Sequence, residues 1–280
     1  MVEGIAIVSQ TPAINMRELA RVSAAIQTQV IRDVAPAWEA SAPINAFFRL
    51  EDAPLGHLTV VIRDDISPAI TGIHRFEGLP VGVVALRTEW SVLVSRVVLD
   101  LLVNPEGNRR MVGPAPVADQ TDVEFITAVS NAGQRDFVYD VHGYAISDFA
   151  HPAYYRGGNG PYCATGRLSR PGQIAPDGCL TWWDATSGRW WQKRGTTGQP
   201  ELVAIDLDGS GDMHEQLRML VDRPSEAVPT PTDPRGSTIA RPAGATHRAQ
   251  RLNAMLNGLY GRAGIDLTAP GPSRPRTERR

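Results

Sequence analysis

Residues 90–105, WSVLVSRVVLDLLVNP, decide how the rest of this sequence is interpreted. Their apolar side chains recur at helical spacing, and Pro105 cannot continue a helix. We therefore predict a helix from Glu89 to Asn104, apolar on most of its surface and consequently buried. The apolar positions that define it are Trp90, Leu93, Val94, Val97, Leu101 and Leu102.

Shorter apolar runs on both sides of this helix predict β-strands and one further helix. Asn15 is a plausible N-cap with Glu18 three residues later, as in a capping box. The apolar stripe that follows, from Leu19 to Ile31, predicts a helix that ends before Pro36. The predicted strands or hairpins are Ile5–Ser9, Ala46–Leu50, His57–Arg63, Val81–Leu86, Phe137–Asp148 and Leu180–Lys193.

Composition places the chain among ordinary globular proteins. Of its 280 residues 42% are hydrophobic and 21% charged, and the net charge of -2 gives no general reason to expect a nucleic acid or an anionic membrane as partner. The first residues lack a basic region followed by a long apolar run, so we expect a cytoplasmic protein, or one packaged in a particle assembled there. The two cysteines, Cys163 and Cys179, are free to pair but do not make a disulfide framework.

Five segments, in order along the chain, together resemble a group of bacterial zincin-like putative metallopeptidases. They are AIQTQVIRDVAPAWEA (25–40), GIHRFEGLPVGVVAL (72–86), WSVLVSRVVLDLLVNP (90–105), VHGYAISDFAHPAYY (141–155) and, more loosely, CLTWWDATSGRWWQ (179–192). The resemblance covers roughly residues 5–195. It implies an α+β fold with a zincin-like mixed sheet, a buried helix and a β-rich continuation, to which this chain adds an extended Pro-rich C-terminal arm.

In that family the buried helix carries Ser-His-Glu-x-x-Glu, which places two zinc ligands on one helix face and a general base beside them. Here Arg96 stands at the His position, and an Arg side chain does not deprotonate to bind a metal. Val97 replaces the general base, and Asp100 alone keeps a possible ligand. The family's acidic Glu-Val-Cys-Asp strand aligns with Ala128 to Asn131, where both acids are absent. Arg96 and Asp100 are expected to form an ion pair where the metal sat.

These losses predict a non-catalytic structural or interaction protein without a cofactor, such as a subunit of a phage virion or another large assembly. Its expected partners are protein subunits of that assembly or copies of itself. One alternative is an active zinc peptidase with a rearranged site built from Asp100 and a histidine such as His74 or His142. The other is a cytoplasmic binding module that uses a Trp-rich hairpin.

That hairpin, LTWWDATSGRWWQKR, is predicted to turn at residues 184–188 and to set two Trp pairs across from each other. Adjacent strand residues face opposite ways, so one Trp of each adjacent pair is expected to be exposed, as a binding patch or as packing under the arm. The candidate residues are Trp182, Trp183, Trp190 and Trp191.

The remaining candidates lie near the C-terminus. Asp206, Asp208, Ser210 and Asp212 match the first half of a calcium loop, but Leu217 stands where the bidentate Glu belongs, which favours a polar turn. We place a globular domain at residues 1–222 and the arm at 223–280, where residues 223–244 hold five prolines. A short helix with Leu252, Leu256 and Leu259 on one stripe is predicted to dock on a neighbouring subunit. The arginine-rich end is the one segment suited to nucleic acid.

Overall fold

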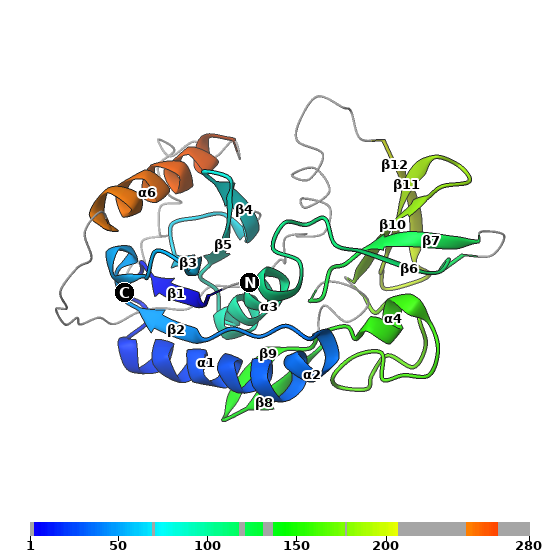
Figure 1. Cartoon of the computed structure of the whole chain (residues 1–280), viewed down its shortest axis with the longest axis horizontal. Helices are drawn as coiled ribbons and strands as arrows, with labels where there is room; N and C mark the ends of the chain where they lie inside the picture. The colour runs from blue at the N-terminus through cyan, green and yellow to red at the C-terminus, as the bar shows by residue number, and fades with distance from the viewer. Residues whose placement is uncertain are drawn as a thin grey trace, which may run out of the picture.

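The structure is a computed structural model that describes residues 3–68, 71–117, 121–130, 137–176, 178–206 and 245–262, with side chains described for residues 247–258 of the last range. Two five-stranded sheets, one two-stranded hairpin and several helices make up these residues (Figure 1). The mixed α+β class predicted from the sequence is confirmed. Across the described ranges, no helix is long and apolar enough to cross a membrane.

The first sheet is mixed and has the strand order β2-β1-β3-β5-β4. Its first four strands in this order run parallel, and the edge strand β4 is antiparallel to β5. Glu77 and Gly78 join β4 to β5 with positive φ angles of 53° and 79°, the backbone that a tight two-residue hairpin requires. The strands are β1 (Ile5–Ser9), β2 (Ile44–Phe47), β3 (Leu58–Arg63), β4 (Gly72–Phe76) and β5 (Leu79–Ala85).

Helix α3 (Trp90–Val103) lies against this sheet and confirms the predicted buried helix, with Glu89 and Asn104 as its caps. It approaches β5 closely because Gly82 has no side chain: a Cβ there would lie 2.4 Å from Cγ1 of Val97.

The same face of the sheet carries a longer helical path than the sequence predicted. Asn15 caps α1 (Met16–Gln29) by accepting a hydrogen bond from the Glu18 N–H at 2.9 Å, as expected. The path does not end before Pro36. It continues through a π-helical turn, η1 (Val30–Val34), into α2 (Ala35–Trp38), where proline is tolerated in the first turn. Ile31, predicted on the buried stripe, is 63% exposed, because it directly follows the buried Val30 and so lies about 100° around the helix from the buried face.

The opposite face of the first sheet is covered by α6 (Ala245–Arg262), which the sequence assigned to a docking arm (Figure 1). Leu252 and Leu256 are buried among β1, β3 and β5 side chains of the same chain, such as Val8 and Val83. The prediction that this stripe reaches a neighbouring subunit is therefore corrected, because burying the stripe against the chain's own sheet satisfies it. The Leu259 side chain lies outside the described residues.

The second sheet is antiparallel throughout, in the order β12-β11-β10-β7-β6. Strands β10 and β11 form the predicted hairpin, with Trp182 opposite Trp191 and Trp183 opposite Trp190. Asp184 holds the turn by accepting hydrogen bonds from the backbone N–H groups of Thr186 and Ser187. The strands are β6 (Arg110–Pro114), β7 (Asp122–Ile126), β10 (Cys179–Asp184), β11 (Arg189–Arg194) and β12 (Glu201–Ile205).

The tryptophans differ from the expected exposed patch. Trp182 and Trp190 are buried, while Trp183 and Trp191 are half-buried. Trp182 and Trp191 pack on the main core, whereas Trp183 and Trp190 pack with Ile126 and Ala128 on the other face. The two half-buried rings therefore occupy opposite faces of the sheet and do not combine into one surface.

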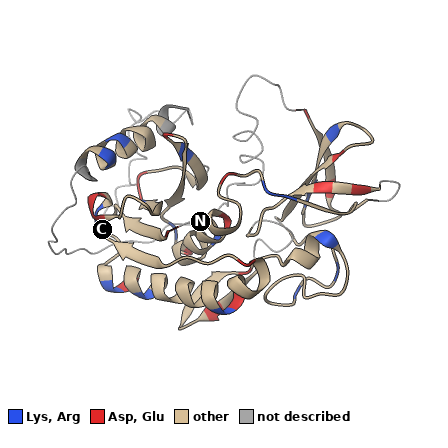
Figure 2. Ribbon diagram, in the orientation of Figure 1, with Lys and Arg blue, Asp and Glu red and all other residues tan. Residues whose placement is uncertain are grey.

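Smaller elements complete the fold. Strands β8 (Val138–Val141) and β9 (Tyr144–Ser147) form a hairpin, in which β9 packs against α3. Helix α4 (Pro152–Arg156) packs against β6. A short 3-10 turn, η2 (Leu50–Asp52), takes the end of the predicted Ala46–Leu50 strand. Cys163 and Cys179 are both buried and do not form a disulfide with each other. Charged residues of both signs are spread over the outer elements (Figure 2).

Candidate functional site

The helix motif singled out in the sequence contains one acidic residue, Asp100, whose carboxylate forms hydrogen bonds with another segment of the same chain. It is buried, and it accepts hydrogen bonds from the Val129 N–H at 2.9 Å and the Ser130 Oγ–H at 2.5 Å. Both donors belong to the segment that aligns with the family's acidic strand. Asp100 therefore joins α3 to that segment, as a structural carboxylate does.

The residues around Asp100 do not fit a zinc ion. Arg96 is buried and directs its Nε–H to Ser147 Oγ at 3.4 Å, and Val97 packs in the core. Ala128 is buried, with its backbone N–H and carbonyl both hydrogen-bonded to the Tyr155 hydroxyl at 3.2 and 3.0 Å. Asn131 lies outside the described residues. The ion pair expected between Arg96 and Asp100 stays a prediction.

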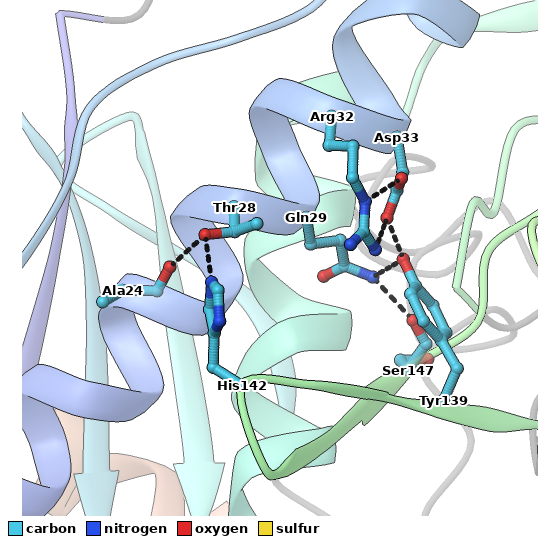
Figure 3. Close-up of polar contacts among 8 residues, drawn as sticks. All are labelled: Ala24, Thr28, Gln29, Arg32, Asp33, Tyr139, His142 and Ser147. Carbon is cyan, nitrogen blue, oxygen red and sulfur yellow. Dashed lines mark hydrogen bonds and ion pairs between the residues drawn. The ribbon is translucent and has the colours of Figure 1, made fainter.

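The rearranged zinc site considered from the sequence does not come together either. His142 hydrogen-bonds with Thr28 at 3.0 Å (Figure 3). His74 lies on the edge strand β4. Within the described residues, no group of three or more His, Cys, Asp or Glu side chains is placed to hold a metal ion. Of the weak calcium loop, the structure describes Asp206 alone. Asp208, Ser210 and Asp212 lie outside the described residues, as does the arginine-rich end.

A buried polar network, centred on Gln29, occupies the space between α1, α3 and the β8–β9 hairpin (Figure 3). The Gln29 amide donates to Ser147 O at 2.7 Å and to the Tyr139 hydroxyl at 3.1 Å, and its carbonyl accepts from Ser95 Oγ at 2.8 Å. Ser95 Oγ also accepts from the Ser147 N–H at 3.3 Å. Because every partner is buried or half-buried, the network fixes how the helices and the hairpin fit together.

The network leads outward to an open cavity of about 600 Å³. Tyr139 donates to Asp33 at 2.8 Å, and Arg32 binds the same carboxylate through two hydrogen bonds of 2.7 and 2.8 Å (Figure 3). Arg32 and Asp33 come from η1, Tyr139 from β8, and His151 from the residue before α4. The described lining residues are Arg32, Asp33, Pro36, Ala37, Tyr139, His151 and Ala164.

Burial and these contacts determine the protonation states of the ionisable side chains that line the cavity. Burial opposes ionisation of Asp33, but hydrogen bonds from Arg32 and Tyr139, together with the Arg32 charge, hold its pKa below the usual value. Burial, reinforced by the neighbouring Asp33, raises the pKa of Tyr139, so the phenol stays protonated. Burial lowers the pKa of His151, although the carboxylates of Asp148 and Asp33 act in the opposite direction. His151 is therefore mostly neutral near pH 7.

The His151 side chain also differs from its neighbours in its hydrogen bonding. Its ring stacks on Phe149 with centroids 5.1 Å apart and planes at 13°. Its backbone N–H donates to Tyr162 O at 2.9 Å, but neither ring nitrogen has a hydrogen-bond partner among the described residues. A neutral imidazole thus faces the cavity with one donor and one acceptor available.

Sequence reasoning did not single out Gln29, Asp33, Tyr139 or His151. Arg32 and Asp33 were visible only as polar residues near the end of a predicted helix. The contacts of Asp33 and Gln29 with Tyr139 span more than 100 residues. The comparisons with known proteins add no further assignment. No protein-family model, curated protein or solved structure matches the chain.

Proposed function

We propose that the chain is a non-catalytic relative of the zincin-like putative metallopeptidases and serves as a structural or interaction protein. The observation that carries this proposal is the buried carboxylate of Asp100, which is held by Val129 and Ser130. A catalytic zinc needs ligands and an open coordination position. This helix instead offers Arg96 at the ligand position and Val97 at the base position. The mixed first sheet, with α3 packed against it, supports the family resemblance.

Metal analysis of the purified protein tests the non-catalytic part. We expect no stoichiometric zinc, no proteolysis of casein, and an unfolding curve that a chelator leaves unchanged. A variant that restores the motif, R96H/V97E/D100E, serves as the matched comparison, because it rebuilds the two helix ligands and the base. Stoichiometric zinc with chelator-sensitive proteolysis in the wild-type protein would show that the proposal is wrong.

The interaction part of the proposal rests on the second sheet. Its two edge strands each expose an apolar side chain, Val112 on β6 at 58% and Leu202 on β12 at 44%. Single exposed apolar residues are common, but sheet edges also carry the backbone groups through which strands of neighbouring molecules pair. An assembly subunit in the cytoplasm, or in a particle built there, would bind other subunits or copies of itself through these edges.

Light scattering after size exclusion tests this part. We expect the wild-type protein to associate as its concentration rises, and the V112D/L202D variant to remain smaller at the same concentration, because charge on an edge strand opposes pairing. I31D, which places a charge at an exposed apolar position of η1 away from that sheet, is the control. A wild-type protein that stays monomeric at every concentration would argue against self-assembly through these edges.

A further inference from the structure

We propose that the cavity between Asp33 and His151 binds an organic cation, namely a primary alkylammonium group, either as a small amine or as a lysine side chain. This inference does not depend on the absence of catalysis. It follows from the hydrogen-bond acceptors, the charges and the apolar surface that meet in this cavity, which has a volume of about 600 Å³, in the range of small-molecule sites.

Two acceptors face the cavity from different elements. The Asp33 carboxylate receives three hydrogen bonds, two from Arg32 and one from Tyr139, whereas two carboxylate oxygens offer about four acceptor positions. Its side chain remains 20% exposed. The neutral imidazole of His151 supplies a second acceptor, with no competing partner among the described residues. An ammonium group has three donors and no acceptor, so it suits this pair.

The charges around His151 favour a cation over an anion. The opposite charges of Asp33 and Arg32, both in η1, largely cancel. The Asp148 carboxylate adds a further negative charge, so the net charge near the imidazole is negative. Tyr139 and Cys163 remain neutral, since burial raises the pKa of each. Arg167 does not line the cavity, and its guanidinium lies over the ring of Phe137, 5.1 Å from the centroid. A bound anion would meet the Asp33 carboxylate beside the exposed Arg32 guanidinium. A bound cation, in contrast, is attracted by Asp33 and by the charge of the buried Asp148 carboxylate that acts at the imidazole.

The remaining surface suits an aliphatic stem. Pro36, Ala37 and Ala164 present small apolar groups beside the polar ones, against which methylene groups can pack. The carboxylate already holds one organic cation, since the guanidinium of Arg32 binds it with both Nε and Nη2. That side chain is 55% exposed, so an ammonium group from solvent can compete with it for the carboxylate.

Histidine NMR of the full chain provides the test, with the His151 ring signal assigned by its loss in H151Q. We expect n-butylamine to shift this signal saturably and to lower the pKa of His151, because a nearby cation opposes protonation. Binding should weaken as pH falls, since protonated His151 repels the ligand. Nα-acetyl-lysine amide should act like butylamine if the site takes lysine side chains. The His142 signal, outside the cavity, should not move.

Two variants, at Asp33 and Arg32, test whether these residues form the binding site. D33N should weaken butylamine binding about tenfold or more, the equivalent of losing one good polar contact. R32A should strengthen it, because it removes the competing guanidinium. Sodium butyrate and butanol are the matched probes. A saturable shift with butyrate and a raised pKa of His151, an equal response to butanol, or no saturable response to either amine would each overturn the proposal. Zinc content and proteolysis are unaffected by these outcomes.

Discussion

Removing the Asp100 carboxylate tests the structural role on which the non-catalytic proposal rests. Asp100 accepts hydrogen bonds from Val129 and Ser130, both buried, at 2.9 and 2.5 Å. Hydrogen bonds to a charged group contribute about 1.5–3 kcal/mol each. D100A removes both and leaves two buried donors without this acceptor, so we expect the free energy of unfolding to fall by about 4 kcal/mol.

The matched variant D100N keeps the shape of the side chain. Its amide oxygen still accepts from Val129, and its NH₂ group can donate to the Ser130 hydroxyl, so we expect a loss of about 1–2 kcal/mol. S130A should cost about 1.5–3 kcal/mol alone and much less in the D100A background, because the two residues share one interaction.

Urea unfolding followed by tryptophan fluorescence measures these differences, since six tryptophans report on the core. Each protein is measured with and without a chelator. A D100A protein within about 1 kcal/mol of the wild type would refute the reasoning, since buried networks of this kind cost more to break. A chelator that destabilises the wild type as much as D100A does would instead identify Asp100 as a metal ligand.

Three further outcomes are expected. Q29L should lower the free energy of unfolding by about 3 kcal/mol in the same urea assay, because it deletes three hydrogen bonds and leaves their buried partners without Gln29. An unchanged free energy would mean that the network does not hold α1 to α3. L252D should release α6 and expose it to limited proteolysis, with a loss of at least about 3 kcal/mol, whereas Q250D on its exposed face should change neither. Because the folded-state pKa of His151 is lowered, its contribution to stability is fully present above the unfolded value of about 6.5 and declines as pH falls toward the folded value. H151Q should therefore lose less stability than the wild type between pH 7 and pH 5, and equal slopes would contradict this sign.

Local sequence signals determined several elements of this fold closely. Pro105 and the apolar spacing before it defined α3, which the structure caps at Glu89 and Asn104. Asn15 defined the start of α1, and the turn residues from Asp184 to Gly188 defined the Trp hairpin and its register. Each of these signals acts through hydrogen bonds or sterics within a few residues, so a single sequence is enough to read it. The family resemblance stays a prediction.

Tertiary structure alone decided which surfaces these elements bury and where the polar groups meet. The stripe of α6 was recognisable from the sequence. That it covers the chain's own first sheet depends on contacts between its leucines and strands that lie much earlier in the chain, at β1, β3 and β5. Tyr139 reaches Asp33 across 106 residues, and Ser95 reaches Gln29 across 66. Hydrogen bonds of this kind need only matching donors and acceptors at the meeting point of two elements, which leaves no periodic trace in the sequence. The helix around Asp100 was therefore read from the sequence, whereas the partners that make its carboxylate structural appeared only in the fold.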